Sequence, residues 1–416
     1  MRNWAGNVTY STGDVREPRT MAELQEALAG SDRVRALGSG HSFNDLIDCT
    51  GTVVSTRALP YGIEIDSAAA VAEVPAAATY AELGVRLQAG GWALANMGSL
   101  PHISVAGACA TGTHGSGVGN GCLATSVVGV ELVCADGTVT TARRGDADFA
   151  GMVLSLGSLG VVTRLWLALL PTYDVAQDVL LDVASSTITE RGVDLLSSAW
   201  SVSLFTSFAD PRVVDAVWRK ARVDDAAAVA AEDWGGRRAE VAVHPIRGLD
   251  AAAATEQLGR PGPWHERLPH FRAAFTPSVG DELQSEFFVP LDRLGEVWPR
   301  LVEASPGFVE ALQVMEVRTV AADELWLSPF HGRRTLAVHA TWVSDLAVVA
   351  PALAALETVL APYDPRPHWG KVYGDRWGPA TVAAAYPELP RFQRLAERLD
   401  PQRCFVNDYV VRMGVR

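Results

Sequence analysis

Residues 36–43 read Ala-Leu-Gly-Ser-Gly-His-Ser-Phe, a glycine turn that follows a short β-prone run. Gly38 and Gly40 carry no Cβ, so the backbone can bend sharply there and approach a bound group closely. Amides and hydroxyls exposed in such a turn form an anion-binding cradle, and His41 adds a nucleophilic nitrogen at its edge. Because residue 43 is Phe, the turn does not extend to the Gly-x-Gly-x-x-Gly motif of a dinucleotide-binding Rossmann unit.

Residues 96–121 form a second stretch of small residues, Asn-Met-Gly-Ser-Leu-Pro-His-Ile-Ser-Val-Ala-Gly-Ala-Cys-Ala-Thr-Gly-Thr-His-Gly-Ser-Gly-Val-Gly-Asn-Gly. It contains His102 and His114 and no charged side chain. One interpretation is a flexible surface loop. The apolar Ile103 and Val105 among the glycines favour instead an ordered loop whose amides and hydroxyls bind a large polyphosphate ligand.

Together these two segments resemble the vanillyl-alcohol-oxidase type of FAD proteins, and within that group the bacterial alditol (xylitol or sorbitol) oxidases. Further matching motifs spread over nearly the whole chain, at residues 3–10, 155–163, 262–271, 316–323, 339–343 and 368–372. Each motif alone is weak, but the set is specific. The resemblance implies a two-domain α+β flavoprotein, in which a vanillyl-alcohol-oxidase (PCMH-type) FAD-binding domain accompanies an α+β substrate-binding domain built on an antiparallel sheet.

We place the domain boundary at Pro171, where the apolar run 161–170 ends. A chain of 416 residues is longer than one core usually serves, which favours two domains. The expected FAD-binding domain is therefore residues 1–171 and the expected substrate-binding domain residues 172–416. Within the latter, the segment from about 366 to 416 is expected to pack back on the flavin.

Local signals predict several elements. Thr-Met-Ala-Glu at 20–23 and Thr-Tyr-Ala-Glu at 79–82 are capping boxes that predict helix starts. The apolar run 127–133 predicts a strand, and Asp-Gly at 136–137 predicts a hairpin turn after it. The alanine-rich stretch 224–232 fits either a solvent-facing helix or a loop.

The charge and cysteine content narrow the class of protein. With 35 basic and 48 acidic side chains the net charge is −13, which argues against a nucleic-acid or anionic-membrane partner and suits a neutral small-molecule substrate.

The five cysteines show no Cys-x-x-Cys spacing, so we expect reduced thiols, no metal site and a cytoplasmic location. No signal-peptide pattern is visible, and the apolar run 346–356 is expected to be a buried helix, too short to span a bilayer. We expect a monomer.

Two β-prone runs in the second half carry polar pairs at a spacing of two. Glu316 and Arg318 lie in one run, and His339 and Thr341 lie in another. Side chains two apart on a strand point to the same face. For a single strand, a polar face in water is the commoner case. Two pairs of mixed type favour instead one sheet that faces a polar cavity, where they would bind the hydroxyls of a polyol.

The resemblance also implies roles for individual residues. The expected reaction converts the terminal primary hydroxyl of an alditol to the aldose, by hydride transfer to flavin N5, with O2 reduced to H2O2. Lys371, Arg318 and His339 are the expected catalytic residues. The expected substrate-binding residues are Ser99, Glu316, Arg318, Thr341 and Lys371. Either Lys371 or His339 could take the proton, and the sequence leaves that choice open.

The resemblance implies that FAD is bound covalently through His41, whose counterpart is joined to the 8-methyl position of the isoalloxazine ring. The attacking nitrogen must be neutral, so the surroundings of this imidazole are expected to disfavour its protonation. The alternative is a histidine that only caps the glycine turn. The expected cofactor-binding residues are Gly38, Ser39, Gly40, His41, Ser42, Ser99, Ser104, Gly107, Thr111, Gly112, Thr113, His114 and Val161.

Two positions depart from the pattern of this family. Gly98 stands where the relatives have Ala, which leaves more room beside the flavin for O2 or a bulkier substrate. Residues 73–78 read Glu-Val-Pro-Ala-Ala-Ala where the relatives carry a Gly-Gly turn. Because Pro75 restricts the backbone, the flavin contacts of that loop are in doubt.

Three other functions stay open. An aldonolactone oxidase or dehydrogenase of the same superfamily would share the first domain and differ in the pocket. An alditol dehydrogenase would pass its electrons to an acceptor other than O2. A zinc hydrolase or sugar-binding module is suggested only by nine histidines and the polar strands, and no His-x-x-x-His or His-x-His pair supports it.

Overall fold

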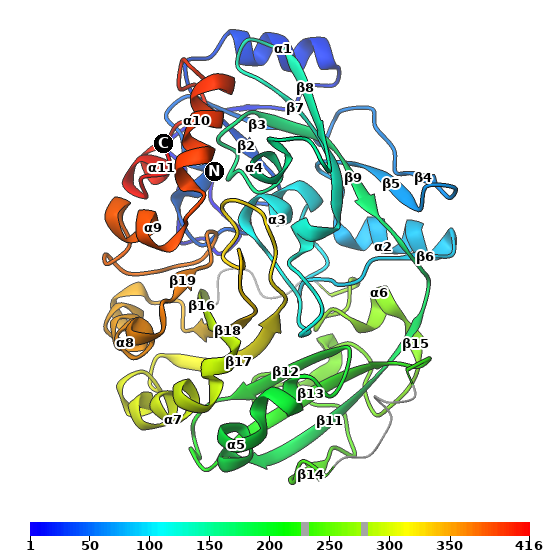
Figure 1. The fold of residues 1–416 in the computed structure, drawn as a ribbon, viewed down its shortest axis with the longest axis vertical. Helices are drawn as coiled ribbons and strands as arrows, with labels where there is room; N and C mark the ends of the chain where they lie inside the picture. The colour runs from blue at the N-terminus through cyan, green and yellow to red at the C-terminus, as the bar shows by residue number, and fades with distance from the viewer. Residues whose placement is uncertain (226–232, 276–281) are drawn as a thin grey trace.

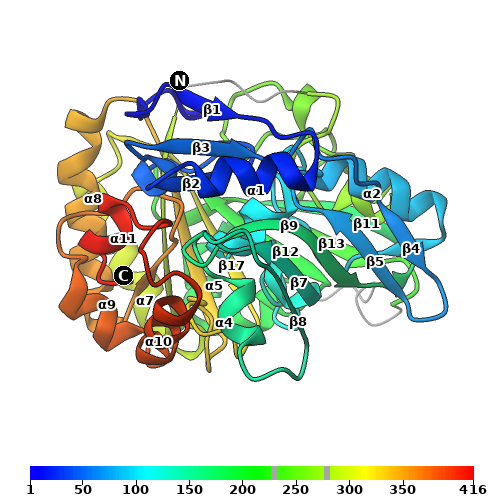
Figure 2. The same cartoon turned by 90° about the horizontal axis from the view of Figure 1, so that it is seen from above.

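The computed structural model describes residues 1–225, 233–275 and 282–416. The chain begins with a small parallel sheet in the order β1-β3-β2, on which α1 lies (Figures 1 and 2). Its elements are β1 (Asp14–Arg16), α1 (Met21–Ala29), β2 (Val34–Leu37) and β3 (Thr52–Ser55). Helix α1 begins where the capping signal predicts, because the Thr20 side chain accepts from the Glu23 amide. Strand β2 leads directly into the glycine turn.

A five-stranded antiparallel sheet follows, in the order β4-β5-β9-β7-β8. The elements of this region are β4 (Glu64–Asp66), β5 (Val71–Pro75), α2 (Tyr80–Ala89), β6 (Trp92–Ala93), α3 (Val105–Thr111), β7 (Val127–Val133), β8 (Val139–Arg143), α4 (Phe149–Val153), β9 (Val161–Ala168) and β10 (Leu170–Pro171). The predicted hairpin is present, because β7 and β8 pair antiparallel across the Asp-Gly turn. Helix α2 begins with a complete capping box at Thr79.

The second part of the chain is built on a nine-stranded sheet in which every strand pair is antiparallel. Along the path β14-β11-β13-β12-β17-β18-β16-β19, sequence neighbours are often not spatial neighbours, and β15 pairs with β11 off this path. The strands are β11 (Asp174–Ala184), β12 (Ser201–Thr206), β13 (Val213–Arg222), β14 (Arg237–Arg238), β15 (Gly262–Pro263), β16 (Leu283–Pro290), β17 (Leu312–Val320), β18 (Thr335–Trp342) and β19 (Arg366–Pro367).

Three helices, α5 (Ser185–Leu196), α7 (Leu294–Ala304) and α8 (Leu346–Leu360), pack against one another and cover this sheet on the side away from the first part of the chain (Figure 1). The short α6 (Trp264–Arg267) packs against β11 and α2. The alanine-rich stretch 224–232 lies almost wholly outside the described residues.

The segment that follows β19 returns to the first part of the chain (Figure 2). It contains α9 (Pro379–Ala385), α10 (Leu389–Leu399) and α11 (Asp408–Arg412). The Val34 amide donates to the Cys404 carbonyl at 2.9 Å, and the Phe43 amide donates to the Gly370 carbonyl at 2.7 Å. Residues 366–416 therefore support the glycine turn from outside the first 171 residues.

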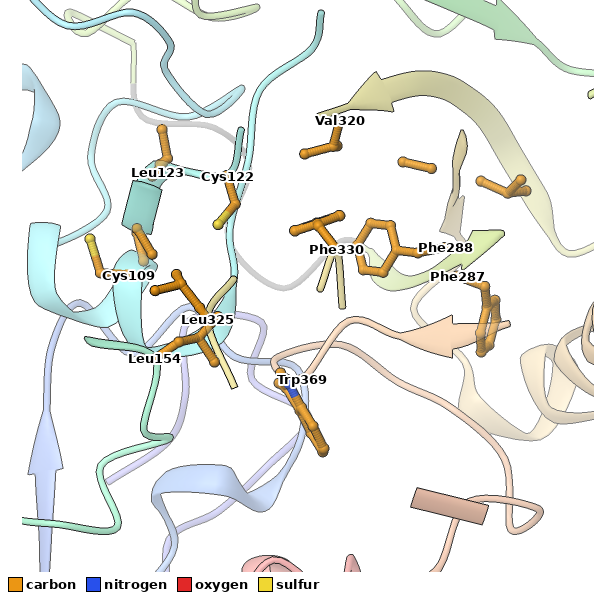
Figure 3. Packing of buried hydrophobic residues seen from close by; sticks show 14 of the residues in the cluster. Cys109, Cys122, Leu123, Leu154, Phe287, Phe288, Val320, Leu325, Phe330 and Trp369 are labelled. Carbon is orange, nitrogen blue, oxygen red and sulfur yellow. The ribbon is translucent and has the colours of Figure 1, made fainter. Parts of the chain in front are cut away.

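The main hydrophobic core is shared by the two parts of the chain. Cys109, Cys122 and Leu123 belong to the same buried cluster as Phe287 and Phe288 of β16, and Figure 3 shows these side chains together with Val320 and Trp369. All five cysteines are buried free thiols. The core therefore holds the first part of the chain firmly against the large sheet.

Helix α8 is the one helix among the described residues that has the length and hydropathy of a membrane span, over Leu346–Tyr363. Its Val349, Leu353 and Leu356 are nonetheless buried in the main core, and the helix packs against α7 and β16. This packing is typical of a core helix, as the sequence predicts, but the expectation that the run is too short to span a bilayer is wrong, because the helix continues beyond residue 356.

Candidate active site

A cavity of about 660 Å³ lies between the first part of the chain and the large sheet. The glycine turn and residues 99–114 line it on one side, and β16, β17, β18 and the segment 368–371 line it on the other. All the expected catalytic and substrate-binding residues reach this cavity: Ser99, Glu316, Arg318, His339, Thr341 and Lys371. The expected cofactor-binding residues that also line it are Gly38, Ser39, Gly40, His41, Ser42, Ser99, Ser104, Gly107, Thr111, Thr113 and His114.

Two of the expected cofactor-binding residues do not line the cavity. Gly112 is the C-cap of α3, with a φ of 73°, and a Cβ there would meet Pro329 and Leu154 rather than open space. Val161 is fully buried in a second core cluster with Val34 and Val54.

The side chain of Val161 points away from the cavity because neighbours on a strand alternate in direction. Its sequence neighbours Gly160 and Val162 line the cavity instead. The structure therefore brings eleven of the thirteen expected cofactor-binding residues to the cavity, whereas Gly112 and Val161 lie beside residues that line it.

The two glycine segments pack so closely that only glycine fits between them. A Cβ on Gly38 would overlap the Ser104 hydroxyl, and one on Gly107 would come within 2.7 Å of it. The Ser104 amide donates to Ser39 Oγ at 3.2 Å, whereas Ser104 Oγ is buried with no hydrogen-bond partner among the described residues. This glycine cradle with its unpaired hydroxyl suits a ligand that brings its own hydrogen-bonding groups.

Residues 73–78 still reach the cavity although Pro75 replaces a glycine turn. Pro75 ends β5, and Ala76 and Ala77 line the cavity. The Ala106 amide donates to the Ala76 carbonyl at 3.1 Å, which ties this loop to α3.

His41 lies at the edge of the cradle with its imidazole against an aromatic ring. The imidazole stacks on Trp4 at 4.7 Å between ring centroids and at 21° between planes. Burial, together with the nearby His102, lowers the pKa of His41 to about 4. The imidazole is therefore neutral at pH 7, which is the form that can act as a nucleophile.

Three neighbouring strands present their polar side chains to the cavity in register. His339 on β18 lies opposite Glu316 on β17 and opposite Glu286 on β16, and Thr341 lies opposite Gln284. Strand β18 is buried along its whole length, and β17 is buried at every residue except the half-buried Gln313. The polar pairs therefore face the cavity, and the alternative of a polar face in water is wrong.

Glu286, which the sequence reasoning missed, connects three of the cavity's basic side chains. Its Oε1 lies 3.0 Å from His114 Nε2 and accepts from Arg318 Nη2 at 2.8 Å, and its Oε2 accepts from Lys371 Nζ at 2.7 Å. Burial alone would raise the pKa of Glu286, but Lys371, His114 and Arg318 outweigh it and hold the pKa well below its usual value. Gln284 and Glu286 show the same spacing of two as the predicted pairs, so the same rule could have found them.

A second carboxylate, Glu316, shares Arg318 with Glu286 and has His270 as a further partner. Its Oε1 lies 2.7 Å from His270 Nε2 and 3.4 Å from Arg318 Nε. Arg318 Nη1 in turn donates to Ser99 Oγ at 3.3 Å. Arg318 therefore joins Ser99 of the first part of the chain to both carboxylates of the sheet.

His339 is the least constrained polar group in this cluster. Both of its ring nitrogens are buried and lack a hydrogen-bond partner within the described part of the chain, and Nδ1 lies 3.8 Å from Glu316 Oε2. Burial and the charge of Lys371 lower its pKa to about 3. A neutral imidazole with both nitrogens unpaired is free to bond a substrate hydroxyl.

The cavity fits FAD on these observations. The glycine cradle with its unpaired Ser104 hydroxyl and the neutral His41 lie on one wall, and the polar face of the sheet lies on the other. No group of three or more metal-ligating side chains with suitable geometry occurs among the described residues.

Comparisons with known proteins agree with this fit. The FAD binding domain family matches residues 14–143, and the D-arabinono-1,4-lactone oxidase family matches residues 282–413. An alditol oxidase of Streptomyces sp. is 45% identical over 414 residues, covering 98% of this chain and 97% of its own. An L-gulono-1,4-lactone dehydrogenase of Mycobacterium tuberculosis is 27% identical over 438 residues, covering 99% of this chain and 98% of its own.

Solved structures show the same fold. A cholesterol oxidase from Brevibacterium sterolicum superposes with a TM-score of 0.79 at 12% sequence identity, covering 99% of this chain and 96% of its own. An identity of 12% shows the fold alone, and together with the FAD binding domain match it shows that the chain is a two-domain α+β flavoprotein.

Proposed function

Because the chain belongs to the alditol oxidase family of FAD-dependent oxidoreductases, we propose that it oxidises alditols with O2 in the cavity between its two parts. One observation carries the proposal beyond the family likeness. The polar rows of β16, β17 and β18 face the same cavity as the glycine cradle, so a polyol bound to the sheet would lie next to a cofactor bound to the cradle.

We propose that FAD is held by the glycine turn, by Ser104 and its neighbours, and covalently by His41. Bound FAD would accept the hydride of the carbinol carbon. It would then pass the two electrons to O2, which is reduced to H2O2. The neutral imidazole of His41 and its position in the cavity wall support the covalent bond.

The side chains of the sheet would bind and orient the alditol. Arg318 and Lys371 supply two cations that favour loss of the hydroxyl proton, and Glu286 holds both of them in place. Ser99, Glu316 and Thr341 would bind the hydroxyls further along the polyol.

We propose His339, rather than Lys371, as the proton acceptor. Neither ring nitrogen of His339 has a hydrogen-bond partner among the described residues, and the ring is neutral, whereas the Lys371 ammonium already donates to Glu286. A group that takes a proton must have a free lone pair, and the neutral imidazole offers one.

A second candidate is the oxidation of an aldonolactone. The match of residues 282–413 to the D-arabinono-1,4-lactone oxidase family favours it. A panel of xylitol, sorbitol, glycerol and L-gulono-1,4-lactone separates the two candidates, because the first three are polyols and the last is an aldonolactone. Peroxide and aldose formed in equal amounts from the alditols, with little turnover of the lactone, would support alditol oxidation; the reverse preference would support the second candidate.

The covalent bond is tested separately. Acid precipitation of the purified yellow protein should leave the colour in the pellet, and the intact mass should include one FAD. The variant His41→Ala should release its flavin into the supernatant. Free flavin from the unmodified chain would rule out the covalent bond without affecting the proposed reaction.

A further inference from the structure

Lys220 of β13 is fully buried in the sheet and does not line the cavity. Its Nζ lies 2.5 Å from the Leu268 carbonyl, 2.9 Å from the Pro269 carbonyl and 3.2 Å from His270 Nδ1. A neutral amine has only two N–H groups, so donation to all three of these atoms takes the ammonium form, although burial lowers the pKa of Lys220 to about 7. Nothing in the proposed reaction uses this cation.

His270 lies between Glu316 and Lys220, and these two partners together set its tautomer. The ionised Glu316 carboxylate can only accept, so His270 Nε2, at 2.7 Å from Glu316 Oε1, carries the ring proton. Burial lowers the pKa of His270 to about 4, so the ring is neutral and Nδ1 accepts from the Lys220 ammonium at 3.2 Å. Edge contacts with Phe205 and Trp218 hold the ring in place, at 5.5 Å and 5.4 Å between centroids. Glu316 Oε1 therefore accepts a hydrogen bond from His270 Nε2, and the orientation of that imidazole depends on the bond between its Nδ1 and Lys220.

The same short segment also holds Ser99. The His270 and Phe271 amides point to the Ser99 carbonyl at 3.1 Å and 3.3 Å. Ser99 belongs to the first part of the chain and Glu316 to the large sheet, so the segment 268–271 connects two substrate-facing residues from different parts of the fold. Lys220 anchors that segment by its carbonyls at 268 and 269.

We propose that Lys220 is a positioning residue for polyol binding, which acts through His270 on Glu316 and through the segment 268–271 on Ser99. The inference rests on the proposed function, because it assigns Lys220 to the geometry of the same substrate pocket. Loss of the ammonium would leave His270 Nδ1 without its hydrogen-bond donor, so the orientation of the ring would no longer be fixed from that side, and it would loosen the anchor of the segment 268–271. Glu316 would then lose its fixed donor, and the pocket would bind the polyol less tightly.

Steady-state kinetics of the holoenzyme with xylitol test this link. Lys220→Met should raise KM by about tenfold with a smaller change in kcat, as expected for loss of an oriented hydrogen bond. Gln177→Leu is the matched control, because Gln177 lies directly opposite Lys220 on β11, is buried, and its side chain has no hydrogen-bond partner among the described residues. An equal effect of both substitutions would mean that Lys220 matters only for packing and would overturn the proposal.

A double-mutant cycle separates a positioning role from a structural one. In a Glu316→Gln background, Lys220→Met should change kcat/KM by less than about threefold, because its target is already altered. His270→Phe keeps an aromatic ring at this position and removes the Nε2–H donor to Glu316, so it should behave like Lys220→Met in both backgrounds. Additive effects of Lys220→Met and Glu316→Gln would overturn the proposal.

Nitrogen NMR of ¹⁵N-histidine-labelled holoenzyme gives a readout that needs no turnover. The His270 signal, identified by its absence in His270→Phe, should show the Nε2–H tautomer with a hydrogen-bonded Nδ1. A proton on Nδ1, or a mixture of tautomers, would contradict the proposal even if Lys220→Met does not fold. An inactive enzyme with the expected His270 tautomer would count against the proposed function and leave this contact standing.

Discussion

The Lys371 ammonium lies 2.7 Å from the Glu286 carboxylate, although 85 residues separate them in the chain. The other oxygen of the same carboxylate accepts from Arg318 at 2.8 Å. One fully buried anion thus holds the two cations that face the expected reacting hydroxyl. This arrangement makes Glu286 the residue on which the geometry of the cationic pair depends.

Glu286→Gln should lower kcat for xylitol by about 10- to 100-fold, because an amide neither balances the two cations nor accepts from both of them. Glu357→Gln is the matched control. Glu357 is a buried carboxylate whose pKa is raised by burial, and it bonds Gly374 and Trp377 outside the cavity. Steady-state kinetics with both variants decide the point, and an equal loss of kcat in the control would count against a specific role of Glu286.

His339→Asn should lower kcat by about a hundredfold and leave KM nearly unchanged, because a proton acceptor acts in the transition state. Thr341→Val removes a hydroxyl on the same strand face and should instead raise KM by a few-fold. A fall in kcat for Thr341→Val as large as that for His339→Asn would contradict the assignment of proton transfer to His339 and of substrate binding alone to Thr341.

Gly98→Ala should slow reoxidation by O2 several-fold and leave alditol binding nearly unchanged. A Cβ there would lie 3.5 Å from Ile103 Cδ1 and 3.6 Å from Thr113 Cγ2, which are ordinary contacts, so the variant should fold normally. Ile103 and Thr113 both line the cavity, and the added methyl group would narrow the space behind them. Stopped-flow measurement of the two half-reactions checks this expectation, and slower reduction with unchanged reoxidation would refute it.

The buried neutral histidines predict an acid-sensitive fold. Burial lowers the pKa of His270 to about 4 and that of His339 to about 3, from 6.5 in an unfolded chain. At pH 5 the unfolded chain binds both protons and the folded chain binds neither, so the free energy of unfolding falls as the pH drops below about 6.5. Each histidine contributes about 2 kcal/mol to that fall by pH 5.

Urea unfolding at pH 7 and at pH 5 measures this loss. Glu286 and Glu316, whose pKa values lie below the ordinary 4.5, add to it only at more acidic pH. His270→Phe should make the difference between the two pH values smaller by about 2 kcal/mol. An unchanged difference would mean that His270 is not a neutral buried group.

Local sequence patterns were sufficient to predict the position of residues whose role depends on a short segment of the chain. The glycine turn around His41 needs close backbone approach, and the pairs Glu316 with Arg318 and His339 with Thr341 follow from strand alternation. Both capping signals also mark true helix starts, because a cap involves only three or four consecutive residues.

Residues whose role depends on contacts across the fold were missed. The spacing of two with Gln284 could have placed Glu286 on the polar face of its strand, but its bonds to His114, Arg318 and Lys371 depend on contacts across the fold, which no local pattern encodes. Lys220 and His270 meet across 50 residues and carry no motif that links them. Gly112 and Val161 were included from the resemblance, but in the structure Gly112 is the C-cap of α3 and Val161 is buried in the second core cluster, so neither lines the cavity.

Anaerobic mixing of the yellow holoenzyme with xylitol tests the central claim most directly, because it isolates electron transfer from the alditol to the cofactor in this cavity. The flavin absorption band should bleach at a rate that saturates with xylitol concentration, and Glu286→Gln should slow that rate without shifting the band of the oxidised enzyme. L-gulono-1,4-lactone should bleach it far more slowly. Fast bleaching by the lactone with none by xylitol or sorbitol would contradict the account.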